Sequence, residues 1–268
     1  MTAGIGVLSP ARAQIVQPLT LNDCITMALK NNSQITIAAL EVQQNQAMQK
    51  TGFSPDKTDL TVTQDPTAGG NIDNSWGVTQ RFAFPTVYTS QNKVLREETK
   101  LSQQSAVMTQ NELVKNVKLA YYRLLYVQER LMVLQKQDSL YKDFARLAEV
   151  RFNAGETSNL EKMAAINKSK ELQLQRLQAE ADVAIATQEL QQLLNTRSSI
   201  SIADTRLTRI AGSFANDTNA TRINPILGFY QQRVSVASFR LRAERNLFMP
   251  DLMIGYNNQF VISSFNPA

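Results

Sequence analysis

Residues 86–195 form two long helical patterns that meet at a short polar turn, residues 151–160. In the first arm, apolar or small residues recur at alternating steps of four and three, with one interruption at Asp138. This spacing averages about 3.5 residues per turn, the period of a helix that supercoils against a partner. The arm therefore predicts one half of a coiled coil. Its seam consists of Leu113, Val117, Ala120, Leu124, Val127, Leu131, Leu134, Tyr141, Ala145, Ala148 and Phe152.

The second arm contains neither glycine nor proline between Gly155 and Gly212, and most of its residues are good helix formers. It carries two apolar stripes. One consists of Leu174, Leu177, Ala181 and Ala184, and the other of Leu172, Ala179, Val183, Ala186, Leu190 and Leu193. Because a helix in an isolated pair needs a single apolar seam, two stripes predict a neighbour on both sides. The hairpin is then one part of a larger helical tube.

The turn between the arms combines signals for a helix end and a helix start. Gly155 can adopt the left-handed conformation that closes a helix. Thr157 or Ser158 can cap the next helix, and Ser158 with Glu161 fits a Ser-x-x-Glu capping box. A plain chain reversal and an exposed tip that docks a partner both agree with this pattern. The candidate docking residues are Asn153, Ala154, Gly155, Glu156, Thr157 and Ser158.

The composition excludes several kinds of chemistry. The 268 residues include no histidine and a single cysteine, Cys24, which excludes imidazole catalysis, zinc clusters and an internal disulfide. The sequence contains no glycine-rich phosphate loop or nucleophile motif, and its acidic residues are scattered. The net charge of +5 is spread along the helices, without a patch suited to nucleic acid. We therefore predict a protein that is not an enzyme, with no catalytic residues, no metal site and no cofactor.

The first 18 residues are predicted to be a leader or a disordered segment. Residues 11–13, Ala-Arg-Ala, resemble a signal-peptide cleavage site, but the apolar stretch before them is short. No apolar run reaches 18 residues, so no transmembrane helix is predicted. A helix is predicted from a Thr20 N-cap to about Lys50, with a break near Asn31 and Asn32.

Two alternating segments follow, residues 59–64 and 76–84. Alternation of polar and apolar residues is typical of a strand with two different faces. In the second segment one face holds Trp76, Val78, Phe82 and Phe84, with only Gln80 polar. A lipid-facing hairpin of a membrane β-barrel and an ordinary hairpin on a soluble core both fit this pattern. The helical patterns on either side leave no obvious soluble core, which favours the lipid-facing strand.

Part of the chain repeats at an offset of 192 residues, where Asn32 matches Asn224 and Val42 matches Val234. In both copies a helix leads through a proline-containing bend to an alternating strand. The second such strand carries Leu252, Ile254, Tyr256, Phe260 and Ile262. We assign residues 19–195 to a first repeat, 196–222 to a linker and 223–268 to the start of a second repeat. That second repeat lacks its second strand and long hairpin, so an incomplete chain is expected.

With these elements in order, the sequence resembles the outer-membrane efflux protein family of the TolC type. The resemblance covers residues 19–266. Its most specific parts are residues 19–32 (LTLNDCITMALKNN), Pro55 before the first strand, and residues 151–160 (RFNAGETSNL) at the turn. Residues 63–74 (TQDPTAGGNIDN) resemble the branch that serves heavy-metal cation pumps of the resistance-nodulation-division class.

The resemblance implies a mainly α-helical chain with a β part. A long antiparallel coiled-coil hairpin would line a periplasmic tunnel, and the strands would join a trimeric outer-membrane β-barrel. The implied function is a passive duct for substrates, including heavy-metal cations, that an inner-membrane pump and a periplasmic adaptor deliver. The implied partners are two further copies of the chain, the adaptor, the pump and outer-membrane lipid. Glu156 departs from the family, which often has an apolar residue after the tip glycine.

A soluble periplasmic coiled-coil scaffold is the alternative function. A scaffold accounts for the heptad seam, but it does not account for the aromatic strand or for the repeat. The two functions differ in one simple property, because a scaffold stays soluble without detergent.

Overall fold

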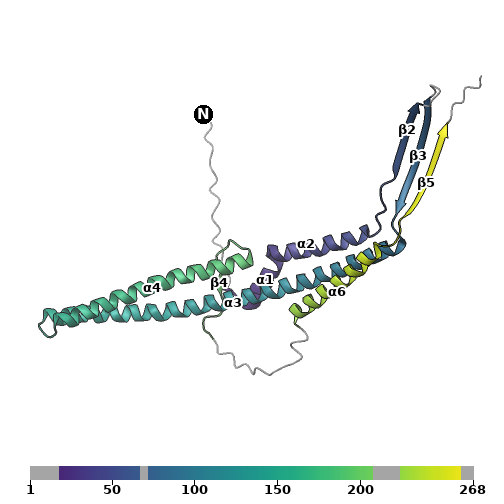
Figure 1. The fold of residues 1–268 in the computed structure, drawn as a ribbon. Coiled ribbons are helices and arrows are strands. Elements are labelled where there is room, and N and C mark those ends of the chain that lie inside the picture. The colour runs from purple at the N-terminus through teal and green to yellow at the C-terminus, as the bar shows by residue number, and fades with distance from the viewer. Residues whose placement is uncertain (1–17, 67–71, 208–223, 261–268) are drawn as a thin grey trace, which may run out of the picture. The chain divides into compact units, whose positions relative to one another are not determined.

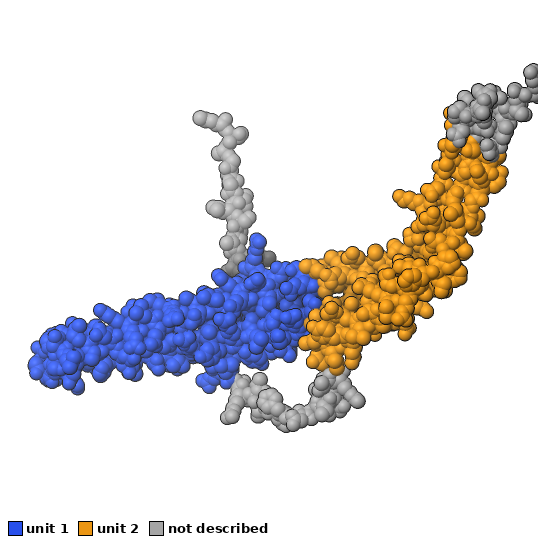
Figure 2. All heavy atoms as spheres, viewed as in Figure 1, with its two compact units in different colours: residues 1–35, 109–215 blue, residues 36–108, 216–268 orange. Residues whose placement is uncertain are grey.

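The computed structural model describes residues 18–66, 72–207 and 224–260 (Figure 1). The chain forms two compact units, one of residues 1–35 and 109–215 and one of residues 36–108 and 216–268 (Figure 2). Three predicted features lie wholly or partly outside the described residues. They are the leader, the linker from residue 208 to its end, and Ile262 in the last strand.

The first unit is built on an antiparallel helical hairpin, which confirms the predicted coiled coil. Helix α3 (Pro85–Asn153) enters this unit at Thr109, and α4 (Asn159–Leu194) returns along it (Figure 1). Contacts between α3 and α4 recur along both helices. Arg123 Nη1 lies 3.0 Å from Glu189 Oε2, Arg130 Nη1 lies 3.4 Å from Asp182 Oδ2, and Lys162 Nζ lies 4.0 Å from the centre of the Phe152 ring.

The predicted seam is the core of this unit. Most of its residues before position 135 are buried on α3, and they face the second of the two stripes on α4. The buried residues are Leu113, Val117, Ala120, Leu124, Val127 and Leu134 on α3, and Leu172, Ala179, Ala186 and Leu190 on α4. The other α4 stripe is open, with Leu174 68% and Leu177 47% exposed. A second neighbour for α4 therefore stays a prediction.

Helix α1 (Leu21–Asn31) closes one side of this core. Thr20 and Asp23 form a capping box at its start, and hydrogen bonds from Thr20 hold the pKa of Asp23 below its usual range. Cys24 and Ala28 are fully buried against the residues of α3 and α4. The predicted break after Asn31 is confirmed, because α2 (Ser33–Met48) starts as a separate helix.

A two-stranded parallel sheet of β1 (Pro18–Leu19) and β4 (Ser201–Ile202) joins the start of the chain to the segment after α4. Tyr121 of α3 lies beneath it and is fully buried. Its hydroxyl donates a hydrogen bond to Asp204 Oδ2 at 2.8 Å, and burial raises the pKa of the phenol. The sequence did not predict this sheet, because strands of two residues carry no alternation.

The ends of α1 and α4 are held together by a reciprocal pair of asparagines. Asn32 Nδ2 donates to the Leu193 carbonyl, and Asn195 Nδ2 donates to the Asn31 carbonyl, both at 3.0 Å. Asn195 has a φ of 50°, in the left-handed region that asparagine tolerates better than most residues. These bonds satisfy helix-end carbonyls that would otherwise lack partners.

In the second unit, polar side chains connect α3 to α2 and to α6 (Pro225–Asn246). Gln49, in the short 3-10 turn η1 (Gln49–Thr51) after α2, donates to Thr99 Oγ1 at 2.6 Å. Gln232 of α6 donates to Glu97 Oε2 at 2.7 Å. The buried apolar residues among the described part of this unit are small, namely Ala38, Val87, Val94 and Val236.

This unit ends in a three-stranded antiparallel sheet in the order β2 (Asp59–Pro66), β3 (Ile72–Phe82), β5 (Leu252–Phe260) (Figure 1). All three predicted strands are present. The prediction that Phe84 belongs to the second strand is wrong. Pro85 is the first residue of α3, where its fixed φ and missing amide are well tolerated, so β3 ends two residues before Phe84.

The burial of Leu124 leads to a first prediction. Leu124→Asp is expected to lower the free energy of unfolding by more than about 3 kcal/mol, because it removes a buried side chain and places a charge in the core. Lys118→Asp introduces the same residue at an exposed position of α3 and should change stability little. Urea unfolding followed by circular dichroism measures both. Equal losses in the two variants would contradict the assigned seam.

Candidate functional site

One face of the three-stranded sheet is apolar over its whole width. Its members are Leu60, Val62, Trp76, Val78, Phe82, Leu252, Ile254 and Tyr256. The strand register brings apolar residues of all three strands onto this face, since Val78 pairs with Leu60 on one side and with Tyr256 on the other. The rings of Trp76 and Tyr256 lie 5.6 Å apart. This face is largely exposed, as Leu60 at 72% and Ile254 at 69% show.

The opposite face of the sheet is polar. A hollow on it is lined by Thr61, Thr63, Ser75, Gly77, Thr79, Gly255 and Asn257. Gly255 lies close to Thr79, whose hydroxyl would be 3.3 Å from a Cβ added to the glycine. Gln80 and Asn258 are polar residues on the apolar face; Asn258 pairs with Trp76, and Gln80 donates to the Asp56 carbonyl at 2.6 Å. A sheet with one apolar and one hydroxyl-rich face can separate a lipid phase from water.

The structure brings together three of the four residues predicted to face lipid. Trp76, Val78 and Phe82 share the apolar face, and Phe84 lies in the connection to α3, where its carbonyl accepts from the Val87 amide. The same face gains residues from β2 and β5 that the prediction did not include. Their alternation was visible in the sequence, but the pairing of β5 with β3 was not, because more than 160 residues separate them.

The hairpin turn closes α3 with a Schellman motif. The Glu156 amide donates to the Arg151 carbonyl at 2.9 Å, and the Gly155 amide donates to the Phe152 carbonyl at 3.0 Å. Gly155 has a φ of 77°, as this motif requires, and a Cβ added there would meet no atom within 4 Å. The predicted helix closure at Gly155 is therefore confirmed, and the glycine is needed for its backbone angle rather than for space.

Ser158, one of the two predicted caps, is the N-cap of α4, and its hydroxyl accepts from the Glu161 amide at 3.2 Å. This is the first bond of the predicted capping box; the reciprocal bond to the Glu161 carboxylate is not among the hydrogen bonds of the described residues. The Glu161 carboxylate accepts a hydrogen bond from Thr157, and Lys162 lies over the Phe152 ring. These contacts fix the turn from both helices. Its backbone is thus well defined without any partner.

All six predicted docking residues lie at this turn, and all but Thr157 are exposed. The surroundings are less polar than the sequence suggested. Leu160 is 80% exposed, and Val150 and Met163 are also exposed beside the turn. Sequence reasoning missed them because it assigned apolar residues to seams. The tip therefore offers both polar groups and an apolar contact area.

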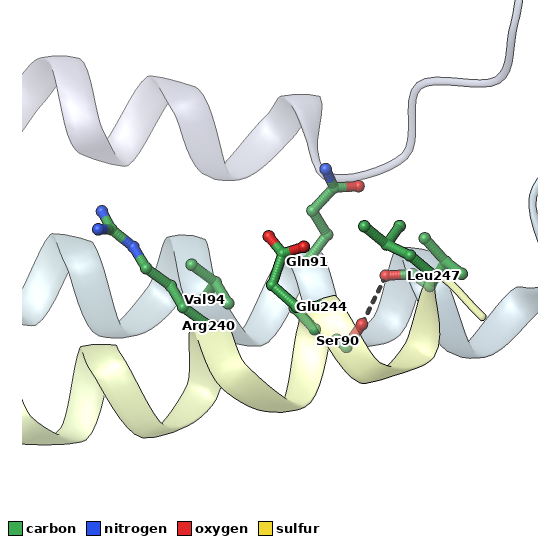
Figure 3. A pocket seen from close by; sticks show the side chains of 8 residues that line it. Ser90, Gln91, Val94, Arg240, Glu244 and Leu247 are labelled. Carbon is green, nitrogen blue, oxygen red and sulfur yellow. Dashed lines mark hydrogen bonds between the residues drawn. The ribbon is translucent and has the colours of Figure 1, made fainter. Parts of the chain in front are cut away.

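A shallow hollow also lies between α3 and α6 in the second unit (Figure 3). It is lined by Val87, Ser90, Gln91, Val94, Arg240, Ala243, Glu244 and Leu247. The Ser90 hydroxyl donates to the Val87 carbonyl at 2.8 Å and is not free for a ligand. Within the described ranges no three His, Cys, Asp or Glu residues come together in a way that could hold a metal ion. None of the helices described there has an apolar stretch long enough to cross a membrane.

Solved structures share this fold. One is a structure of CusC from work on the conformational changes that accompany its folding and transmembrane channel formation. It has a TM-score of 0.75 and 18% identity, and the match covers 97% of this chain. The outer membrane channel CmeC of Campylobacter jejuni has a TM-score of 0.73 and 15% identity, and the match covers 91% of this chain. The outer membrane protein VceC of Vibrio cholerae has a TM-score of 0.70 and 14% identity, and the match covers 92% of this chain.

This chain is shorter than those relatives. It spans 65% of CusC, 62% of CmeC and 66% of VceC. A comparison with curated proteins gives no match. The family model for outer membrane efflux proteins matches residues 58–196, which include β2, β3 and the α3–α4 hairpin with its tip, but not β5. Since this match covers more than half of the sequence, the chain belongs to the outer membrane efflux protein family.

Proposed function

We propose that this chain is a channel component of a tripartite efflux system in the outer membrane. Its sheet would contribute strands to a membrane barrel, with the apolar face toward lipid and the polar face toward the lumen. Its hairpin would line a helical tunnel in the periplasm. The observation that carries the proposal is the two-faced sheet, in which Leu60, Val78 and Tyr256 lie in one row and Thr61, Gly77 and Asn257 lie on the other side.

The proposed assembly is a homotrimer. Support comes from the open stripe of α4, where Leu174 and Leu177 are exposed at coiled-coil spacing. Strands β2 and β5 are the outer strands of the sheet, and an unpaired strand edge is stable in a membrane only when another strand covers it. Further copies of the chain can supply both the helices and the strands.

The proposed partners outside the trimer are a periplasmic adaptor, which would dock at the tip, and an inner-membrane pump of the resistance-nodulation-division class. A duct moves substrate without chemistry, in agreement with the lack of a catalytic motif in the sequence. Heavy-metal cations are the proposed cargo, on the resemblance of residues 63–74, of which 67–71 lie outside the described residues. These cations would pass through the duct as substrate.

A soluble scaffold remains the competing function, and solubility tests it. The exposed apolar face, with Val62 at 74% and Ile254 at 69%, would promote aggregation in water. We expect the chain to fractionate with outer membranes and to need detergent for extraction. Full recovery in the soluble periplasmic fraction would contradict the duct.

Two adjacent residues of β3 test the orientation of the sheet. Val78→Arg is expected to cost about 2 to 4 kcal/mol of barrel stability, because it places a cation in lipid near the middle of the strand. Thr79→Arg puts the same side chain on the polar face and should be mild. Urea unfolding in lipid vesicles measures both variants. A larger loss for Thr79→Arg would reverse the assignment of the two faces.

Gly155 tests whether the tip geometry serves docking. Gly155→Val forces a β-branched residue to a positive φ and should displace the whole turn, so capture of a periplasmic adaptor is expected to fall at least tenfold. Gly155→Asn is the matched control, since asparagine tolerates this conformation and the site has open space. Pull-down from detergent extracts, with trimer formation checked, measures capture. Normal capture by the valine variant would place the contact elsewhere.

Glu156 tests the charge of the tip. No ion pair joins this carboxylate to another described residue, so it is free to meet a cation on the adaptor. Glu156→Lys is expected to weaken capture, and the difference from the parent should shrink as salt rises. Glu149→Lys makes the same reversal on the exposed shaft of α3 and should leave capture unchanged. An equal effect of both variants would indicate net charge alone.

A further inference from the structure

The interruption of the α3 seam at Asp138 is matched by a second interruption on α4. The inner stripe of α4 runs through Leu172 and Ala179, and the position between them that faces α3 is Arg176. Asp138 is 4% exposed, and its Oδ2 lies 3.0 Å from Arg176 Nε and 2.8 Å from Lys142 Nζ. A charged residue of each helix therefore occupies a core position of the hairpin.

This pair is poorly satisfied. Asp138 Oδ1 is buried without a hydrogen-bond partner, and Arg176 Nε makes no hydrogen bond despite its short distance to Oδ2. Arg176 also pairs with Glu180 through Nη1. Buried ion pairs with unsatisfied atoms are usually no more stabilising than apolar residues of similar size. Stability alone therefore does not account for two charges in the seam.

The repeating apolar seam by itself hardly distinguishes its register from one shifted by seven residues, whereas Tyr121 and the turn favour the observed one, since Gln128 would replace the buried Tyr121. Seam residues repeat at this interval, so Leu131 could take the place of Leu124. Of the two exposed ion pairs only one is kept by the shift, because Arg130 would come opposite Glu189 where Arg123 now lies, whereas Gln137 would come opposite Asp182. Around the charged pair, the buried apolar cluster of the hairpin is small and consists of Leu134, Leu172 and Ala179.

The buried pair does distinguish the two registers. In the shifted packing Asp138 would take the place of Leu131, beside Asp182, a residue of the same charge. Arg176 would face Ala145 and lose its partner on α3. Neither charge would have a partner of opposite sign across the seam, which is unfavourable above all for Asp138, since it is buried whereas the Arg176 side chain is 23% exposed.

We propose that Asp138 and Arg176, together with Tyr121 and the turn, set the register of the α3–α4 hairpin and are positioning residues for its tip. A shift of seven residues would move the turn by three to four residues and remove Gly155 from its centre. Other side chains would then form the tip. The inference rests on the proposed function only in the use of the tip for docking, because the register is a property of the chain alone.

Spin labels report the register directly. Cysteines at the exposed positions Asp143 and Lys170, which lie opposite each other across the hairpin, receive nitroxide labels. Cys24 should stay unlabelled, because it is fully buried and burial raises the pKa of its thiol to about 11; the parent without added cysteines verifies this. Labelled chain is diluted into unlabelled chain, so that distances within one chain dominate. A shift of seven residues moves one label by about 10 Å along the helix axis.

The parent and the control Arg123→Gln/Glu189→Gln, which removes an exposed interhelical pair, should give one distance. Asp138→Leu/Arg176→Leu should remain helical and melt no earlier than the parent, yet show a second, longer distance. If the leucine variant does not fold, Asp138→Ala/Arg176→Ala is measured in the same way. A single unchanged distance in the folded variant would overturn the proposal and leave the turn as the source of register. Adaptor binding plays no part in this measurement, so its outcome is separate from that of the proposed function.

Discussion

The burial of the α3 stripe against α4 and α1 is the interaction on which the first unit depends. Val117, Tyr121 and Leu190 are fully buried at its centre. Apolar burial is the main favourable term in folding, and long helices with few tertiary contacts are marginal without it. The caps, the asparagine pair and the short β1–β4 sheet act at the ends of helices that this seam already holds together. They decide where the helices stop rather than whether they form.

The second unit is held together by different interactions. Its helices are joined by hydrogen bonds from Gln49, Gln232 and Arg240 to α3, and large apolar residues such as Leu241 remain exposed. Polar contacts give direction with little net stabilisation, because water competes for the same groups. Such a unit leaves much of its apolar surface uncovered. Both the sheet and the helices of this unit therefore expose apolar residues that the described chain does not cover.

Local signals explain most of what the sequence predicted. The heptad seam, Gly155, Ser158 and the alternating strands each depend on residues within a few positions of one another, and the structure contains all of them. Phe84 failed because alternation alone was counted, although Pro85 already indicated a helix start. The β1–β4 pair, the β3–β5 pairing and the Asp138–Arg176 contact join distant segments. Spacing within one segment cannot reveal such contacts. The interruption of the α3 seam at Asp138, and the polar position between Leu172 and Ala179 on α4, were the only hints of the last one.

The burial of Cys24 in α1 has a consequence for the life of the protein in an oxidising compartment. Only the thiolate attacks a disulfide or reacts readily with oxidants, and a raised pKa keeps this form scarce at neutral pH. The sole thiol of the chain is thus protected from mispairing with other exported proteins once α1 has docked. Before that moment it is exposed, so the order in which α1 and the hairpin fold decides how long the chain is vulnerable to oxidative cross-linking.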